Sequence, residues 1–164
     1  MKAAVVMGSK SDLPVLEKTI KTLKNFGVEV EAHVISAHRT PDAAHAFAKN
    51  ARDNGIEVII AAAGKAAHLA GVLAAFTTMP VIGLPIKSST MDGLDSLLST
   101  VQMPEGIPVA TVAINGAENA GLLAVQMLSL KYDVLKLKLQ EYKTAMAEKV
   151  KKADQELKTE VESL

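Results

Sequence analysis

Short apolar runs alternate with amphipathic helical patterns along the first 130 residues of the chain. The central runs have no polar face, as expected of strands that are buried on both sides of a sheet. Such alternation implies a parallel sheet with right-handed crossovers and with helices on both faces. We therefore predict a three-layer α/β/α, flavodoxin-like fold with five strands. In chain order, the predicted strands are residues 3–7, 28–35, 58–63, 80–84 and 109–114.

The rest of the chain, residues 131–164, has a different pattern. Apolar side chains recur every three or four residues from Leu135 to Leu164, which is typical of one long helix with an apolar seam. A five-stranded domain has no obvious place to bury so long a seam. We expect a single domain over residues 1–164, with a core at 1–130 and a tail that packs on another subunit. A solvated helix is the alternative, because lysines make the end of the tail polar.

The composition excludes several kinds of protein. Lys+Arg and Asp+Glu both number 18, so the chain has no net charge that would attract nucleic acid or an acidic membrane. The absence of cysteine excludes disulfides, thiolate zinc sites and a cysteine nucleophile. The histidines lack the spacing of a helical metal pair, and no metal is predicted. Residues 1–8 lack the layout of a signal peptide, and no apolar run approaches the ~20 residues that span a bilayer, so we expect a cytoplasmic protein.

Three loops should meet at the carboxyl edge of the sheet, where ligands bind in parallel α/β proteins. They are Gly8–Asp12, Ser36–Pro41 and Gly64–His68. The first loop offers hydroxyls, a carboxylate and helix N-terminal amides, which suit a phosphate, although Asp12 would suit ribose hydroxyls. The alternative is that Ser11 or Asp12 only caps the next helix. A Walker loop and a G-x-G-x-x-G fingerprint are both absent, so the sequence indicates neither a nucleoside triphosphate nor a dinucleotide.

His38 and Arg39 are the stronger signal. They lie side by side between a predicted strand and a helix that Thr40 should cap and Pro41 should open. Histidine exchanges protons near neutral pH, and arginine holds phosphate with paired donors. The alternative is a polar turn in which Arg39 caps a carbonyl. His68, in the third loop, either serves the same site or packs with one nitrogen satisfied.

Four motifs occur together and in order along residues 3–130. They are Gly8-Ser9-Lys10-Ser11-Asp12, Ser36-Ala37-His38-Arg39-Thr40-Pro41, Ala66-Ala67-His68-Leu69 and Gln102-Met103-Pro104-Glu105-Gly106-Ile107-Pro108-Val109. In this set the chain resembles the PurE family of purine biosynthesis, and specifically its bacterial mutase type. The resemblance implies that a carboxylate moves from the exocyclic nitrogen of 5-(carboxyamino)imidazole ribonucleotide to carbon 4 of the ring. It also implies an octamer that uses no metal, biotin or nucleotide cofactor.

The resemblance further implies roles for individual residues. His38 would be the general acid–base, giving a proton to the carbamate nitrogen as carbon dioxide leaves and taking one from the carboxylated ring carbon. Small apolar residues would hold the freed carbon dioxide in a dry pocket. The substrate-binding residues would be Gly8, Ser9, Ser11, Asp12, Ser36, Arg39, Gly64 and His68.

The chain departs from the family pattern in three places. Mutases usually carry glycine where Lys65 stands and proline where Ala70 stands, and the loop Asn115–Glu118 is shorter than the family's glycine-rich version. Animal-type members, which carboxylate aminoimidazole ribonucleotide with free carbon dioxide, often have a basic residue near the Lys65 position but lack the Ala66–Leu69 run. Direct carboxylation is therefore the first alternative function. The second alternative is a non-enzymatic module that binds a ribose phosphate.

Overall fold

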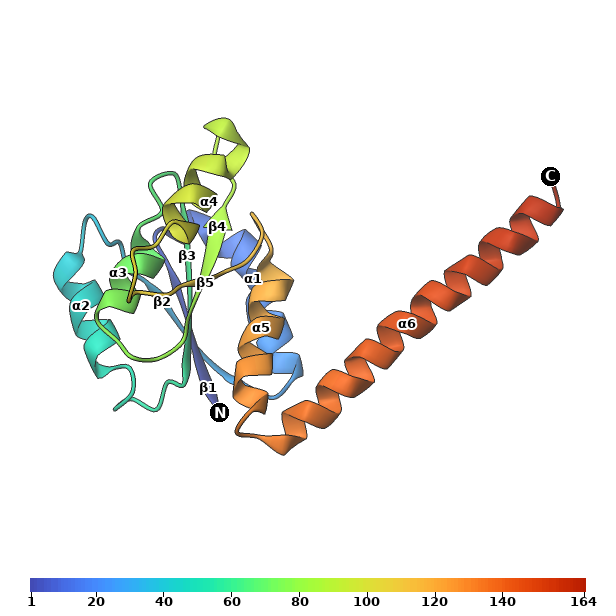
Figure 1. Cartoon of the computed structure of the whole chain (residues 1–164), viewed down its shortest axis with the longest axis horizontal. Coiled ribbons are helices and arrows are strands. Elements are labelled where there is room, and N and C mark those ends of the chain that lie inside the picture. The colour runs from blue at the N-terminus through green and yellow to red at the C-terminus, as the bar shows by residue number, and fades with distance from the viewer.

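The computed structural model describes all 164 residues and contains one five-stranded, all-parallel sheet (Figure 1). The strand order β2-β1-β3-β4-β5 is the flavodoxin-like order, so the predicted fold class is confirmed. Each of the five predicted strands is present. The strands are Lys2–Met7 (β1), Glu29–Val34 (β2), Val58–Gly64 (β3), Val81–Ile86 (β4) and Ala110–Thr111 (β5).

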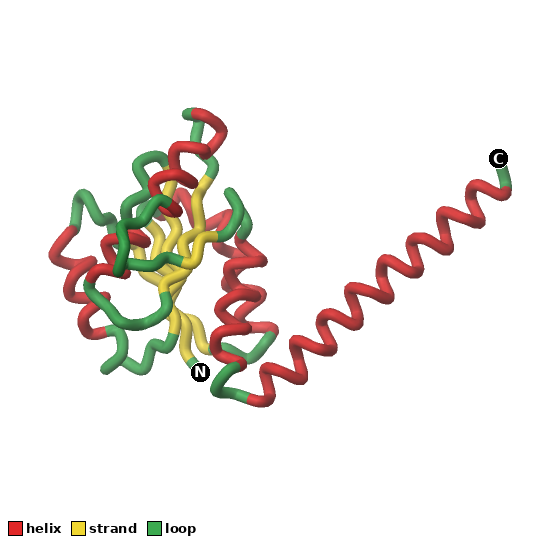
Figure 2. The backbone as a smooth tube through the Cα atoms, in the orientation of Figure 1, coloured by secondary structure: helices red, strands yellow, loops and turns green.

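Helices cover both faces of the sheet and form the two outer layers (Figure 2). Helices α1 and α5 pack on one face, α2 and α3 pack on the other, and α4 lies beside β4. Two short 3-10 turns, η1 and η2, precede α1 and α4. The bounds are Lys10–Asp12 (η1), Leu13–Asn25 (α1), Pro41–Asn50 (α2), Leu69–Ala75 (α3), Met91–Gly93 (η2), Leu94–Val101 (α4), Ala117–Ser129 (α5) and Asp133–Glu162 (α6).

The side chains of the central strands alternate between two apolar cores. In β1, Ala3, Val5 and Met7 pack toward α1 and α5, whereas Ala4 and Val6 pack toward α2 and α3. These side chains are all buried. The apolar runs without a polar face are therefore explained by burial on both sides of the sheet.

Asp12 and Thr40 occupy the N-cap positions of α1 and α2, as predicted, but neither side chain bonds to the amides of its helix. The hydroxyl of Ser9 accepts hydrogen bonds from the amide (3.3 Å) and the hydroxyl (2.8 Å) of Ser11, so Ser9 caps η1. Asp12 already has helical backbone angles and caps nothing with its side chain. Thr40 precedes α2 as expected, but its hydroxyl bonds to the backbone of Ser36 instead of the helix amides. The turn before α2 thus provides Thr40 with a backbone partner at Ser36, and in the turn before α1 it is Ser9 that caps.

The fifth strand was predicted over residues 109–114 but contains only Ala110–Thr111. The carbonyl of Pro85 in β4 points toward this edge and accepts a bond from Asn115 N at 2.9 Å. Proline has no amide hydrogen, so β4 cannot return a bond to β5 at this position. The regular ladder therefore stops after two residue pairs.

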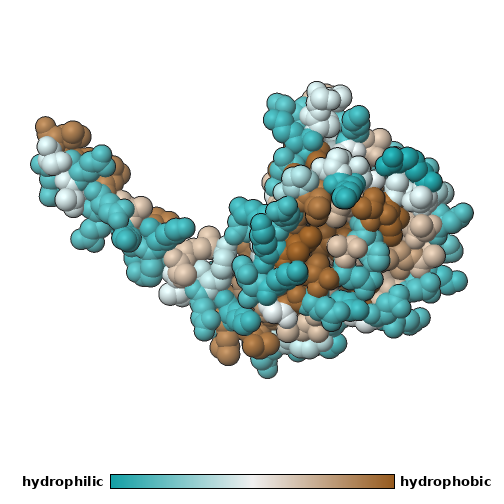
Figure 3. Space-filling model, turned by 180° about the vertical axis from the view of Figure 1, so that it is seen from behind, coloured by the Kyte–Doolittle hydropathy of each residue, from teal (hydrophilic) through white to brown (hydrophobic).

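Helix α6 extends away from the body of the molecule (Figure 1). Leu135 is buried, and Leu139 and Tyr142 pack partly against the core around α1 and α5. Every residue from 143 to 164 is exposed, including apolar residues that are visible along the tail in Figure 3. The prediction of one long helix is confirmed, whereas its packing on another subunit stays a prediction. None of the helices has the length and apolar character required to cross a membrane.

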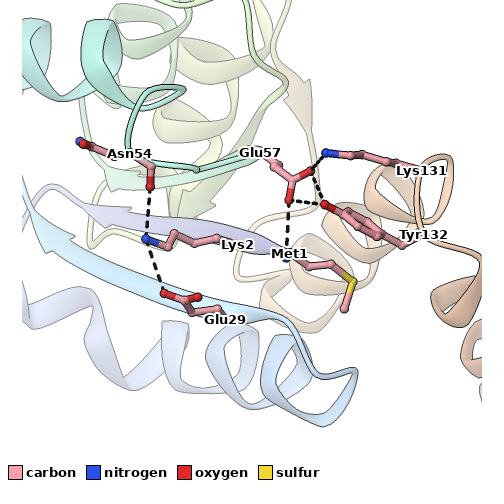
Figure 4. A network of polar contacts seen from close by, with 7 residues as sticks. All are labelled: Met1, Lys2, Glu29, Asn54, Glu57, Lys131 and Tyr132. Atoms are coloured by element: carbon pink, nitrogen blue, oxygen red, sulfur yellow. Dashed lines mark hydrogen bonds and ion pairs between the residues drawn. The ribbon is translucent and has the colours of Figure 1, made fainter.

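A polar network fixes the junction of α5 and α6 to the amino-terminal edge of the sheet (Figure 4). Glu57, just before β3, accepts hydrogen bonds from Lys131 Nζ at 2.8 Å and from the Tyr132 hydroxyl at 3.0 Å. The terminal ammonium of Met1 lies 3.7 Å from the same carboxylate. Burial opposes ionisation of Glu57, but its contacts with Lys131 and Tyr132 outweigh burial and hold its pKa below the usual value. The network thus ties the start of α6 to the edge of the sheet.

Candidate active site

A cavity of about 650 Å³ lies at the carboxyl edge of the sheet, and residues that follow β1, β2, β3 and β4 line it. Its size falls within the range of small-molecule sites in proteins. Eight of the nine residues predicted from the sequence line this cavity, and the ninth, His68, contacts one of them. The eight are Gly8, Ser9, Ser11, Asp12, Ser36, His38, Arg39 and Gly64.

His38 and His68 form a pair at this edge of the sheet. The Nε2 atom of His38 lies 2.9 Å from Nδ1 of His68, and the two rings meet nearly edge to face. One of these nitrogens must carry the hydrogen and the other must accept it, so the bond links the tautomers of the two rings. Both side chains are exposed rather than packed in the core. The bond leaves Nδ1 of His38 available for a different partner.

Arg39 links the first two loops of the site. Its Nη2 donates to the carbonyl of Gly8 at 3.0 Å, and its Nε donates to the hydroxyl of Ser36 at 3.3 Å. Arg39 therefore does bond to a carbonyl, which was the alternative role that the sequence suggested for it. A guanidinium has five N–H donors, so these bonds leave donors free for a ligand. The contacts hold the planar group in place beside the cavity.

The loop after β1 contributes hydroxyls and a carboxylate to the cavity. The hydroxyls of Ser9 and Ser11 bond to each other at 2.8 Å. Burial raises the pKa of the Asp12 carboxyl above its usual value, although hydrogen bonds from Ser9 and Ser11 oppose that shift. This wall of the cavity can donate hydrogen bonds to an anion and accept them from a hydroxyl-rich group.

Lys65 follows β3 with a φ of 58°, in the left-handed region that glycine occupies most easily. A non-glycine residue held in this region costs on the order of 1 kcal/mol. The two residues on either side, Gly64 and Ala66, also line the cavity. The backbone of Lys65 is therefore strained at a position directly beside the site.

Sequence reasoning missed the contribution of β4. Ile86, Lys87 and Ser88 line the cavity, and they lie at the carboxyl end of this strand. Lys87 pairs with Asp92 at 3.1 Å, and its amide donates to the side chain of Asn115 at 2.9 Å. Ligands bind at the carboxyl ends of parallel strands, and this rule indicated the other three loops. Applying it to the fourth predicted strand would also have indicated these residues.

The other two histidines, His33 and His45, do not line the cavity. His33 bonds to Glu31 at 2.7 Å and lies against Phe47 with the rings tilted, and His45 lies against Phe76. No group of three metal-ligating side chains occurs in the chain. The expected absence of a metal stays a prediction.

A parallel sheet with a histidine pair, an arginine and hydroxyls converging on a cavity at its carboxyl edge defines a flavodoxin-like enzyme acting on a small anionic molecule. The profile of the family described as AIR carboxylase matches residues 2–149 of the chain. The chain belongs to this family, the PurE family of the motif resemblance.

Individual relatives agree with this assignment. The N5-carboxyaminoimidazole ribonucleotide mutase of Pyrococcus abyssi is 60% identical over 145 residues, which cover 88% of this chain and 83% of the relative. The enzyme of the same name from Thermotoga maritima is 53% identical over 156 residues, which cover 95% of this chain and 91% of the relative. The crystal structure of Treponema denticola PurE superimposes with a TM-score of 0.87 at 30% identity, covering 95% of this chain and 98% of that one.

Proposed function

We infer that the chain is an N5-carboxyaminoimidazole ribonucleotide mutase, an isomerase of purine biosynthesis. The observation that carries this inference is the high identity with mutases of two distant organisms over nearly the whole chain. In this reaction the bond between the exocyclic nitrogen and the carboxyl carbon breaks, and a bond from carbon 4 of the imidazole to the same carboxyl carbon forms. The substrate is a ribonucleotide with a phosphate at one end and a carbamate at the other.

The proton steps require one group that acts in both directions, and we assign them to His38. As carbon dioxide leaves, the departing nitrogen takes a proton from the imidazolium of His38. After carbon 4 attacks carbon dioxide, the ring carbon returns its proton to the neutral imidazole. The position of His38 in the cavity wall and its bond to His68 support this assignment. Because the proton given in the first step is recovered in the second, the reaction needs no external acid or base.

We assign the phosphate end of the substrate to the wall that contains Arg39, Ser9 and Ser11. The free donors of the guanidinium suit phosphate oxygens, and the two hydroxyls lie close together beside them. Asp12 would accept hydrogen bonds from the ribose hydroxyls. Its raised pKa reflects burial, which such hydroxyls would offset by replacing lost water.

Carbon dioxide must stay in the site between the two bond changes. Ala63, Gly64, Ala66, Leu69 and Ile86 give the cavity a small apolar section beside the reacting end. Such a surface offers few hydrogen bonds to water, so it favours an uncharged gas molecule over bulk solvent. Retention of both fragments lets recombination proceed at a high effective concentration.

The assay of two substrates tests the inferred function. The purified chain should convert N5-carboxyaminoimidazole ribonucleotide to the C4-carboxylated product without added bicarbonate. The second candidate is direct carboxylation of aminoimidazole ribonucleotide, which the description of the matching family as AIR carboxylase favours. Product formation only from aminoimidazole ribonucleotide plus bicarbonate would establish the second candidate and exclude the mutase.

We further propose that the outer part of α6 packs on another copy of the chain, within the octamer that family membership suggests. The exposed apolar residues Val150 and Leu157 support this proposal. Replacing both by aspartate should lower the mass measured by light scattering, whereas aspartate at Gln155 and Lys151 should not. An unchanged mass in the first variant would exclude the contact. The expected cytoplasmic location also stays a prediction, which fractionation of cells would test.

A further inference from the structure

Lys65 occupies a place in the backbone where glycine is the low-energy residue. It has a φ of 58° directly after the end of β3. Four non-glycine residues of the chain have positive φ, and Lys65 is the only one of them that lines the cavity. Four glycines occupy other left-handed positions. A side chain kept at such a position requires an explanation, and its location points to the cavity.

The ammonium of Lys65 is the one cation of the cavity wall without a protein partner. Arg39 donates to Gly8 and Ser36, and Lys87 forms an ion pair with Asp92. No hydrogen bond or ion pair engages Lys65. Its charge is therefore available to an anionic ligand in the cavity.

We propose that the ammonium of Lys65 binds the carboxylate that moves during the reaction, an inference that rests on the proposed function. The substrate has two anionic ends, and the wall formed by Ser9, Ser11 and Arg39 suits its phosphate. Lys65 comes from a different loop, the one that follows β3. It lies three residues before His68, in the same turn between β3 and α3, and His68 bonds to His38. This shared turn is the reason to assign its ammonium to the reacting end of the substrate.

The proposed contact has a definite consequence for the kinetics. The migrating group is an anion in the substrate and in the product, but it is neutral while it is free carbon dioxide. A cation at this place therefore stabilises the two bound carboxylates and not the state between them. Interactions made in the ground state strengthen binding without raising the rate of the chemical step. Lys65 should thus lower KM. It should leave kcat unchanged or reduce kcat slightly.

The test compares two nucleotides that differ only in the carboxylate. Calorimetry would measure the Kd of the C4-carboxylated product and of aminoimidazole ribonucleotide, which lacks that group. Lys65→Met should weaken binding of the carboxylated nucleotide about fivefold, as for a partly solvated ion pair, and leave the other unchanged. Lys65→Arg, which keeps the charge, should restore the difference between the two nucleotides. Higher salt should weaken the preference of the wild type for the carboxylated nucleotide. It should have little effect on the ratio of the two dissociation constants in Lys65→Met.

A glycine variant separates the charge from the backbone. Lys65→Gly should lose the same preference for the carboxylated nucleotide as Lys65→Met, while its Tm should rise because the left-handed strain is removed. Equal weakening of both nucleotides in Lys65→Met would place the charge at the phosphate and overturn the proposal, as would no change in either.

The result is separable from the test of the proposed function. Mutase turnover by the wild-type chain decides that function. The ratio of the two dissociation constants in the variants decides the role of Lys65. An active wild-type enzyme whose Lys65→Met variant keeps the full preference would retain the function and lose the inference.

Discussion

Replacing Glu57 by glutamine should destabilise the chain by about 1–1.5 kcal/mol. The carboxylate receives hydrogen bonds from Lys131 at 2.8 Å and from Tyr132 at 3.0 Å, and its side chain is 22% exposed (Figure 4). The lysine is 68% exposed, so solvent screens its ion pair, which contributes little. The partly buried bond from the tyrosine contributes most of the rest, about 1 kcal/mol. Glutamine keeps the shape of the side chain but removes the charge, and it replaces one of the two accepting oxygens by an NH2 group that faces other donors.

Urea unfolding of the full chain at a fixed protein concentration would measure this change. For a chain of this size the expected loss corresponds to a decrease in Tm of roughly 2–6 °C. Glu29→Gln is the matched control, because Glu29 lies at the same edge of the sheet, is 69% exposed and lies 3.5 Å from Lys2. It makes the same change in charge and should leave the stability unchanged. Equal effects of the two substitutions would refute the reasoning.

The effect of the Glu57 substitution should depend on pH in a defined direction. Burial would raise the pKa of Glu57, but its contacts with Lys131 and Tyr132 hold the pKa below its usual value in the folded state. A depressed pKa stabilises the fold above the unfolded pKa of about 4.3, and this contribution disappears as the pH falls through the folded value. The difference between wild type and Glu57→Gln should be full at neutral pH and shrink below about pH 4. A difference that stays constant through this range would contradict the assignment.

The remaining predictions concern the site and the packing of β4. His38→Asn should lower kcat about 10³-fold while the product still binds, measured by steady-state kinetics and calorimetry; wild-type turnover would exclude the assigned role. Arg39→Ala should raise KM about tenfold with kcat largely kept, and an unchanged KM would remove Arg39 from the phosphate site. Gly83→Ala should destabilise the fold by about 2–3 kcal/mol in urea unfolding, because an added Cβ would meet the methyl groups of Thr100 and Val109, the latter at 2.9 Å. Unchanged stability would show that these neighbours move aside.

The fold could be predicted from the sequence because the burial of each element determines the spacing of its apolar residues. The runs that became β1 and β3 are apolar at every position since both of their faces are covered, and α6 shows its seam in the spacing of its apolar residues. The partners of local hydrogen bonds cannot be predicted from such spacing. Thr40 has the right residue type for a cap, yet its hydroxyl bonds to the backbone of Ser36 instead of the helix amides. The end of β5 depended on Pro85, a residue of the neighbouring strand.

The candidate site could be predicted to the extent that it follows the edge of the sheet. The loops after β1, β2 and β3 come together because parallel strands end at the same edge, and this brought His38 beside His68. The distance between the two rings depends on how α2 and α3 pack on the sheet, so no spacing in the sequence contains it. The left-handed backbone at Lys65 was equally invisible, because lysine carries no preference for that conformation.

Helix α6 has 30 residues and is therefore about 45 Å long, but only its first turns lie against the body. Lysine–carboxylate pairs such as Lys151 with Glu148 and Lys158 with Asp154 add only about 0.2–0.5 kcal/mol each. An unsupported helical segment of this kind is marginal in water. If its distal half packs on another copy of the chain, as proposed, dilution should unwind that half while the sheet and the cavity stay intact. The helical signal in circular dichroism should then fall as the protein concentration falls.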